Sequence, residues 1–427
     1  MGRQLQEPSS KANSQYLFHR YLRMHKIATR LSVFLLIGSL SFGQAYAESL
    51  KYSPIPLDKY LEIVKQNNAL IGSSQLDVET ATANKESKAL YNFQPSISYS
   101  RGSWYPQVPY APYISPQSST YSFNFNVEGW GKRSARADLA QSQMASSATQ
   151  LQTTTTNLET VAINGYIDTL RLSLMVQSYG NALNKLTPIK ADPKLADSVR
   201  FLKYYQNASE KDLMFSALNL LNYSGDALKD LPYPKGNLNF PMQNFNIEGL
   251  VEQGQKRRMD VIVLQAAIDV AEKNVTLTNQ NRNVDLSPYI SQTRTPQYND
   301  GGITYTSQNA ISAGVSIPIP IANYLQTADI VQAANQKLQS EMQLRDLKVQ
   351  IKVQVLQAFL QYSAAKDALV QAQSAYEAVI KSPNKDPVQA VMDARDKEGA
   401  LLDAKTNHLK AVVYLWRQSG NYSVPTL

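Results

Sequence analysis

Side chains that could carry out covalent or metal chemistry are scarce in this sequence, which has no cysteine and three histidines. His19 and His25 lie among the first 47 residues, so His408 is the single histidine in the rest of the sequence. Thiol chemistry is therefore excluded, and a catalytic triad or a histidine-based zinc site is close to impossible. The sequence also shows no nucleophile paired with a base. We predict no enzyme, no metal and no cofactor.

The net charge of +8 says little about partners, because most of it lies at the N-terminus. Residues 1–47 hold six Lys or Arg and one acid, so five of the eight charges belong to this segment. The remaining chain is nearly balanced, without the basic excess that is typical of nucleic-acid binding. We expect no nucleic-acid partner.

Residues 1–47 have the pattern of an N-terminal extension with an export signal. Residues 24–30 are basic, residues 31–43 form an apolar core, and Ala45 and Ala47 match a cleavage site of small residues. The apolar core is too short for a permanent membrane span. We expect cleavage after Ala47 and a true start at Met24; the alternative is an anchor that is kept. Without cysteine, the exported protein would not be a lipoprotein.

The chain after residue 47 repeats itself at a spacing of about 190 residues. Four segments return in the same order: 76–81 as 268–271, 94–98 as 287–291, 137–140 as 328–331 and 161–167 as 354–360. We interpret the chain as a tandem duplication, with repeats at 48–245 and 246–427.

Each repeat is expected to contain a helix, two strands and a helical hairpin, which together make a mainly α protein with a small β part. The assignment rests on alternating and helical spacing of apolar residues. The predicted segments of the first repeat are a helix at 57–93, strands at 96–104 and 120–128, and a hairpin at 132–229. Those of the second repeat are a helix at 247–286, strands at 289–295 and 303–317, and a hairpin at 323–418.

The predicted long helix at 323–381 carries two apolar stripes on nearly opposite sides. One stripe runs from Leu338 to Leu360 and the other from Leu344 to Ala358, with lysines on one flank and glutamines on the other. An ordinary amphipathic helix has only one such stripe. Two stripes predict a neighbour on each side and water in front and behind, as in the wall of a hollow cylinder. A helix inside a thick bundle is the alternative.

Residues 120–127 alternate strictly, which places Tyr121, Phe123, Phe125 and Val127 on one side of a strand. Two short strands per repeat are too few to bury this side in a two-sheet core, whereas lipid would accept it. Four strands cannot close a barrel around a lumen, so several copies must share one. Three copies would give twelve strands and a cylinder of twelve hairpin helices.

Both predicted hairpins turn at a similar motif. Aspartate is a favourable N-cap, and proline suits the first helical position, so each motif should start the return helix. The residues concerned are Lys190, Asp192 and Pro193 in the first tip, and Lys385, Asp386 and Pro387 in the second.

This layout resembles the outer-membrane efflux protein family, the TolC-like channels. The resemblance covers nearly all of the chain after residue 47, and its motifs are QPSISYS, VEGWGKRSARADLAQ, YIDTL, LSPYISQT and FLQYS. It implies a homotrimer, with a twelve-stranded barrel in the outer membrane of a Gram-negative bacterium and a twelve-helix periplasmic tunnel. It also implies an exit duct for tripartite efflux or type I secretion, joined to an inner-membrane transporter through a periplasmic adaptor protein. The cargo (drug, metal or protein) is left open.

The resemblance also implies roles for particular residues. In TolC-like channels two acids near the start of the last helix form rings at the narrow end of the tunnel, and Asp393 and Asp396 match them. Their spacing places both on one helix face, where threefold repetition would favour cations. The alternative is a solvated face, with Arg395 and Lys397 as local partners. The two tips would dock the adaptor, although family tips usually contain glycine and these contain Asp-Pro.

Two other classes of protein stay open as alternatives. An exported structural coiled-coil protein of the cell envelope would use the strands as a small soluble sheet, which the aromatic side of residues 121–127 disfavours. An exported enzyme would need a cluster of reactive residues that the sequence does not show.

Overall fold

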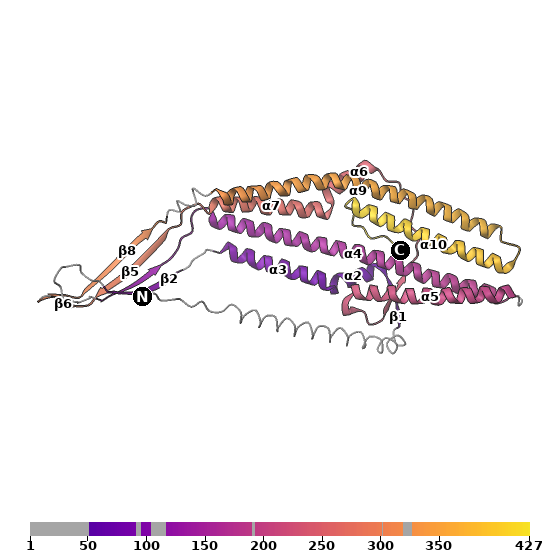
Figure 1. The fold of residues 1–427 in the computed structure, drawn as a ribbon, viewed down its shortest axis with the longest axis horizontal. Helices are drawn as coiled ribbons and strands as arrows, with labels where there is room; N and C mark the ends of the chain where they lie inside the picture. The colour runs from indigo at the N-terminus through magenta and orange to yellow at the C-terminus, as the bar shows by residue number, and fades with distance from the viewer. Residues whose placement is uncertain (1–50, 91–94, 104–116, 190–192, 301, 319–326) are drawn as a thin grey trace, which may run out of the picture.

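The computed structural model describes residues 51–90, 95–103, 117–189, 193–300, 302–318 and 327–427. The predicted cleavage site at Ala45 and Ala47 lies outside the described residues, as do Lys190 and Asp192 of the first tip. The described chain is elongated, with a β-sheet at one end and helices side by side over the rest of its length (Figure 1).

The helices run along the long axis of the molecule. At 1.5 Å per residue, the two longest helices, α4 and α9, each span about 80 Å. The helices are α2 (Leu57–Asn67), α3 (Ala69–Ala89), α4 (Lys132–Leu186), α5 (Pro193–Tyr223), α6 (Ile247–Arg257), α7 (Met259–Gln280), α9 (Ala328–Lys381) and α10 (Pro387–Gln418), with a 3-10 turn η1 (Gly225–Ala227).

The helices pack mainly in one layer. Near the sheet the order across the layer is α3, α4, α7 and α9, and towards the far end it is α5, α4, α10 and α9 (Figure 1). Helix α9 therefore lies at one edge of the layer, with α6 packed against it near Ile351, while α3 and α5 share the other edge.

The main sheet has four antiparallel strands in the order β2-β3-β5-β8, so β2 and β8 are its edges. The predicted strand at 303–317 is two strands, because β7 pairs with β6 in a separate hairpin. The strands are β1 (Tyr52–Pro56), β2 (Ser96–Ser103), β3 (Gln117–Asn124), β4 (Leu231–Lys235), β5 (Ser287–Thr295), β6 (Tyr298–Asp300), β7 (Ile303–Tyr305) and β8 (Gln308–Ser316).

The predictions of one helix at 57–93 and one at 247–286 are wrong, because each segment is broken by a residue with extended backbone. Asn68 (ψ 128°) separates α2 from α3, and Arg258 (ψ 140°) separates α6 from α7. The Asn68 side chain accepts a hydrogen bond from Leu70 N–H and donates one to Tyr223 O, both at 2.9 Å. These polar contacts replace helical hydrogen bonds at the break.

The main hydrophobic core lies in the middle of the molecule, around Tyr166 of α4. The Tyr166 hydroxyl donates to Ile55 O at 2.8 Å and accepts from Lys235 N–H at 2.9 Å, so it joins α4 to the parallel pair β1 and β4. This pair was not predicted, since its sequences YSPIP and LPYPK contain prolines that disfavour strands.

Candidate functional site

The main sheet gathers apolar side chains from all four strands on one face. Tyr121 pairs with Tyr99, and Phe123 pairs with both Ile97 and Ile290. Opposed residues in antiparallel strands lie on the same face. The alternation predicted for one strand therefore continues across the sheet. We call this side the apolar face; its exposed large side chains are Ile97, Tyr99, Tyr121, Phe123, Ile290, Ile311 and Val315.

The four residues predicted to face lipid are placed on or next to this face. Tyr121 is 54% exposed and Phe123 40% exposed in the single chain. Strand β3 ends before Phe125, but the ladder continues, since Phe125 N–H donates to Pro288 O at 3.2 Å and Val127 N–H donates to Leu286 O at 2.7 Å.

The opposite face of the sheet is polar. One row across the sheet consists of Ser98, Ser122, Ser291 and Ser312 in register. In the next row the Thr120 and Thr293 hydroxyls lie 3.1 Å apart. The sheet therefore has one side suited to an apolar environment and one side suited to water.

A compact junction joins the sheet to α4. Asp285 accepts hydrogen bonds from Gly129 N–H at 2.6 Å and Lys132 Nζ at 2.8 Å. Burial raises the pKa of Asp285, but these hydrogen bonds outweigh it and bring the pKa below its usual value. Gly131 adopts φ 83° as the N-cap of α4, a conformation that suits glycine. The exposed indole of Trp130 lies between the two glycines.

The two stripes of α9 have different surroundings. Ile351, Val355 and Ala358 of one stripe are fully buried against neighbouring helices of the same chain. The other stripe is uncovered in the single chain, and its exposed side chains are Leu338, Met342, Val349, Val353, Leu356 and Leu360. Gln354 of the predicted wet flank accepts a hydrogen bond from Arg258 at 2.6 Å, so this flank is partly packed.

The start of α10 carries the two predicted ring residues. Asp386 caps the helix by accepting from Val388 N–H at 2.9 Å, with Pro387 at the first helical position. Asp393 accepts from Gln389 Nε2 at 2.7 Å. Asp396 is exposed and lies 3.3 Å from Arg395 Nη1, which is the local partner of the alternative interpretation. A ring would need Asp393 and Asp396 from three copies of the chain, and the structure contains one copy. The acidic rings therefore stay a prediction.

A cluster that the sequence did not predict joins α4 to α10 near the tips. The guanidinium of Arg395 stacks over the Tyr179 ring at 3.5 Å. Tyr205 of α5 also stacks with Tyr179, with 6.3 Å between the ring centroids. Ser178 donates to Glu398 at 2.6 Å. We call these α4–α10 contacts the seam; they border a cavity of 160 Å³.

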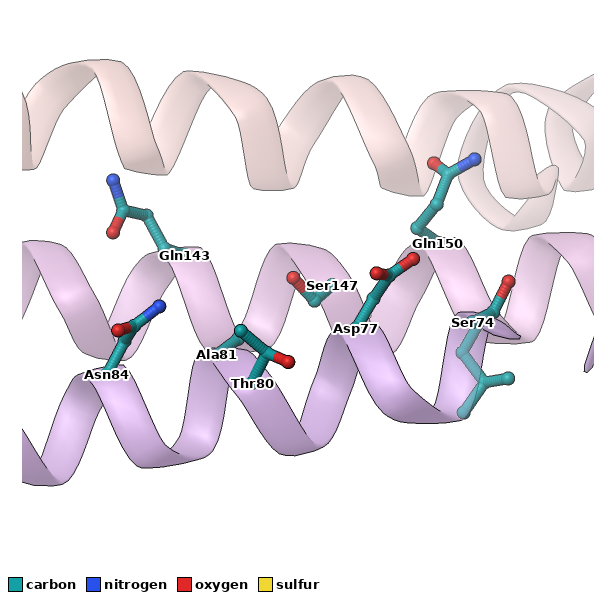
Figure 2. A pocket seen from close by; sticks show the side chains of 9 residues that line it. Ser74, Asp77, Thr80, Ala81, Asn84, Gln143, Ser147 and Gln150 are labelled. Carbon is teal, nitrogen blue, oxygen red and sulfur yellow. The ribbon is translucent and has the colours of Figure 1, made fainter. Parts of the chain in front are cut away.

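A shallow groove of 390 Å³ lies between α3 and α4 (Figure 2). Its lining is polar and mostly uncharged, and Asp77 is its one carboxylate. Figure 2 shows the side chains of Asn84, Asp77 and Ser74 along one helix and those of Gln143, Ser147 and Gln150 along its neighbour.

Across the described residues, no group of three or more His, Asp or Glu side chains has the arrangement of a metal site. None of the helices in the described part of the chain is both long enough and apolar enough to cross a membrane.

Sequence reasoning missed several members of the apolar face and the whole seam. Ile97, Tyr99 and Ile290 alternate with serines, so the alternation in their own strands could have identified them. Tyr179 and Arg395 are far apart in the sequence, and no local pattern predicts that they stack.

The chain has the fold of outer-membrane channels, as comparison with solved structures shows. The outer-membrane channel OprN matches with a TM-score of 0.64 and 14% identity, over 86% of this chain and 90% of that chain. The CmeC outer-membrane channel of Campylobacter jejuni matches with a TM-score of 0.58 and 14% identity, over 87% of both chains.

A third neighbour is the MtrE outer-membrane channel of Neisseria gonorrhoeae, solved in its open state. It matches with a TM-score of 0.56 and 13% identity, over 86% of this chain and 89% of that chain. A scan of protein-family models and a search of curated proteins gave no match. The likeness therefore lies in the fold, and what the neighbours do supports a proposal for this chain.

Proposed function

We propose that three copies of this chain form an outer-membrane channel, which serves as the exit duct of a tripartite efflux or type I secretion system. The observation that carries the proposal is the apolar face on a sheet with two open edges. A sheet that faces lipid must pair all its backbone groups, which requires a closed barrel. One chain supplies four strands, and the smallest bacterial barrels have about eight.

The helical layer also needs neighbours at both edges. Helix α9 leaves one apolar stripe uncovered, and α5 at the opposite edge exposes Phe201, Tyr204 and Phe215. At 1.5 Å per residue, Phe215 lies about 33 Å from the tip along α5, and Leu360 lies about 32 Å from the tip along α9. The ends of α4 and α5 that adjoin the first turn, and those of α9 and α10 that adjoin the second, lie at the same end of the molecule (Figure 1). Helix α9 of one copy therefore fits against α5 of the next.

Three copies would close both layers together. They give a twelve-stranded barrel with the apolar face of the sheet outwards and its polar face inwards. A cylinder of twelve helices continues this barrel. In this arrangement the chain passes substrates and performs no chemistry. The resemblance adds a periplasmic adaptor protein and an inner-membrane transporter as partners, with outer-membrane lipid around the barrel.

The remaining assignments follow the same proposal. The chain is exported by cleavage after Ala47, and residues 48–245 and 246–427 are the two repeats that each supply two strands and one hairpin. The tips around Pro193 and Pro387 dock the adaptor. Asp393 and Asp396 of three copies form two acidic rings that narrow the tunnel.

Planar-bilayer conductance of the purified protein tests the proposal. We expect a resolved conductance with cation preference, which Asp393→Asn/Asp396→Asn weakens because the rings lose their charge. Lys85→Gln/Lys88→Gln on α3 serves as a control for changed charge away from the tips. Unaltered selectivity in the acidic double variant would reject the rings, and a protein that never conducts would reject the channel.

A further inference from the structure

The sheet has two arginines, and both lie in one row at its outer end, away from the helices. Arg101 of β2 and Arg294 of β5 are each paired with Ser119 of β3, so they flank this residue on the apolar face. Both side chains are exposed. With strands about 4.8 Å apart, the two Cα atoms lie roughly 10 Å from each other.

The electrostatic surroundings of this row favour an anion. The four strands of the sheet carry no aspartate, glutamate or lysine, so the two guanidinium groups set the charge of this part of the sheet. Arginine presents a planar fork of donors that binds phosphate oxygens in pairs. Two forks at this separation can hold one headgroup that carries two phosphates.

The depth of the row identifies the kind of anion. The next row inwards contains Tyr99 and Tyr121, whose rings lie 4.9 Å apart, and the row after that contains Ile97, Phe123 and Ile290. In membrane barrels, an aromatic girdle marks the boundary between hydrocarbon and headgroups. The arginine row lies two residues, or about 7 Å, beyond the tyrosines, which is the headgroup region.

We propose that Arg101 and Arg294 form a binding site for the phosphates of a glycolipid in the outer leaflet of the outer membrane, the lipid A class. The inference rests on the proposed function, since it needs the apolar face to be embedded in lipid. It goes further by assigning a lipid ligand to the outside of the barrel. The site anchors the barrel at a fixed depth and binds the surrounding lipid.

The test compares Arg101→Gln/Arg294→Gln with the unchanged protein, using diphosphorylated lipid A added to purified protein in detergent micelles. Native mass spectrometry measures how much lipid stays bound. We expect lipid A to bind the double variant about tenfold more weakly, because two charge-assisted contacts are lost. Arg101→Lys/Arg294→Lys keeps the charge without the fork and should lie in between. Arg200→Gln/Lys203→Gln on α5 removes two charges elsewhere and should match the unchanged protein.

Three results would overturn the site. One is equal binding of lipid A by the unchanged protein and the double glutamine variant. The second is equal binding of inorganic phosphate, which indicates a free anion site. The third is equal binding of phosphatidylglycerol, which indicates no preference for the glycolipid. Conductance separates this from the proposed function, because the double glutamine variant should still conduct. If the unchanged protein conducts but binds lipid A no better than the double glutamine variant does, the lipid site is refuted and the channel is not.

Discussion

His408 lies buried on α10, with its ring 5.5 Å from that of Tyr362. Its Nε2 atom has no hydrogen-bond partner among the described residues. Burial lowers the pKa of His408, and the nearby charge of Lys366 lowers it further. The imidazole is therefore held neutral in the folded protein and packs inside the layer of helices.

This buried imidazole should make stability depend on pH. Below a pH of about 6.5 the unfolded chain binds a proton that the folded chain binds only at lower pH, so stability falls as pH drops through this window. The loss is at most about 1.4 kcal/mol per pH unit. Urea unfolding at pH 7.5 and 5.5 measures it. His408→Leu should remove this part of the dependence, and an unchanged dependence would show that other groups cause it.

Gly129 is constrained by the junction between sheet and helix. A Cβ atom at this position would lie 2.5 Å from Val284 O, which is a backbone atom that cannot turn away. Gly129→Ala should therefore destabilise the protein by about 1–3 kcal/mol. The melting temperature of the purified oligomer measures this.

Gly180 supplies the matched control, because a Cβ atom there meets nothing within 4 Å and the residue lies inside α4, six residues before its end at Leu186. Gly180→Ala should be neutral or stabilise by up to about 1 kcal/mol through helix propensity. If both variants melt at the same temperature, the junction is not the tight contact described above.

At the scale of elements, the seam holds the α9–α10 hairpin against the α4–α5 hairpin. Each of its contacts is modest: a cation–π pair is worth about 0.5–2 kcal/mol and a hydrogen bond to a charged group about 1.5–3 kcal/mol. Buried apolar clusters and the ion pairs Arg171–Asp403 and Lys410–Asp168 also join α4 to α10. Changes in the seam can therefore weaken this interface near the tips without unfolding either hairpin. Burial raises the pKa of Tyr179 more than the charge of Arg395 lowers it, so the tyrosine stays neutral.

In the proposed trimer, loosening the seam should open the tip end of the tunnel. Arg395→Met removes the cation–π contact, and Glu398→Gln takes the charge from the hydrogen bond with Ser178. We expect the double variant to have a larger single-channel conductance than the unchanged protein. Arg200→Met, at a position with an 83% exposed side chain on α5, is the control and should leave conductance unchanged. A double variant with unchanged conductance would mean that the seam does not restrain the tip.

The elements differ in how far the sequence could predict them. The return helix of the second hairpin was predicted to start at Pro387 and to end at residue 418, and α10 spans Pro387–Gln418. The prediction succeeded because the N-cap Asp386, the proline and regular apolar spacing are all local signals. The breaks at Asn68 and Arg258 could not be predicted, since they depend on polar partners more than 90 residues away in the sequence. The register of the sheet likewise depends on strands from both repeats. Local patterns predicted where most strands and helices lie. The seam and the helix breaks could not be predicted, because they depend on contacts between residues that are distant in the sequence.

At the scale of the whole molecule, the open edges are the main finding. One chain exposes an apolar face on a four-stranded sheet, an apolar stripe on α9 and aromatic side chains on α5. A soluble monomer would leave all three in water. Three copies in a membrane would place the apolar face in lipid. They would also pack the end of the α9 stripe against α5 of the next copy, because Leu360 and Phe215 lie at matching distances from the tips.

Cross-linking in native membranes tests this closure most directly. Because the sequence has no cysteine, only the introduced cysteines of this chain can form disulfides. Oxidation of Leu360→Cys/Phe215→Cys should give covalent dimers and trimers, and no larger species, on a non-reducing gel. Leu338→Cys/Phe215→Cys places the two positions about 32 Å apart along the axis, so it should give no cross-link between them. A chain that stays monomeric after oxidation, and is found free in the periplasm, would contradict the account.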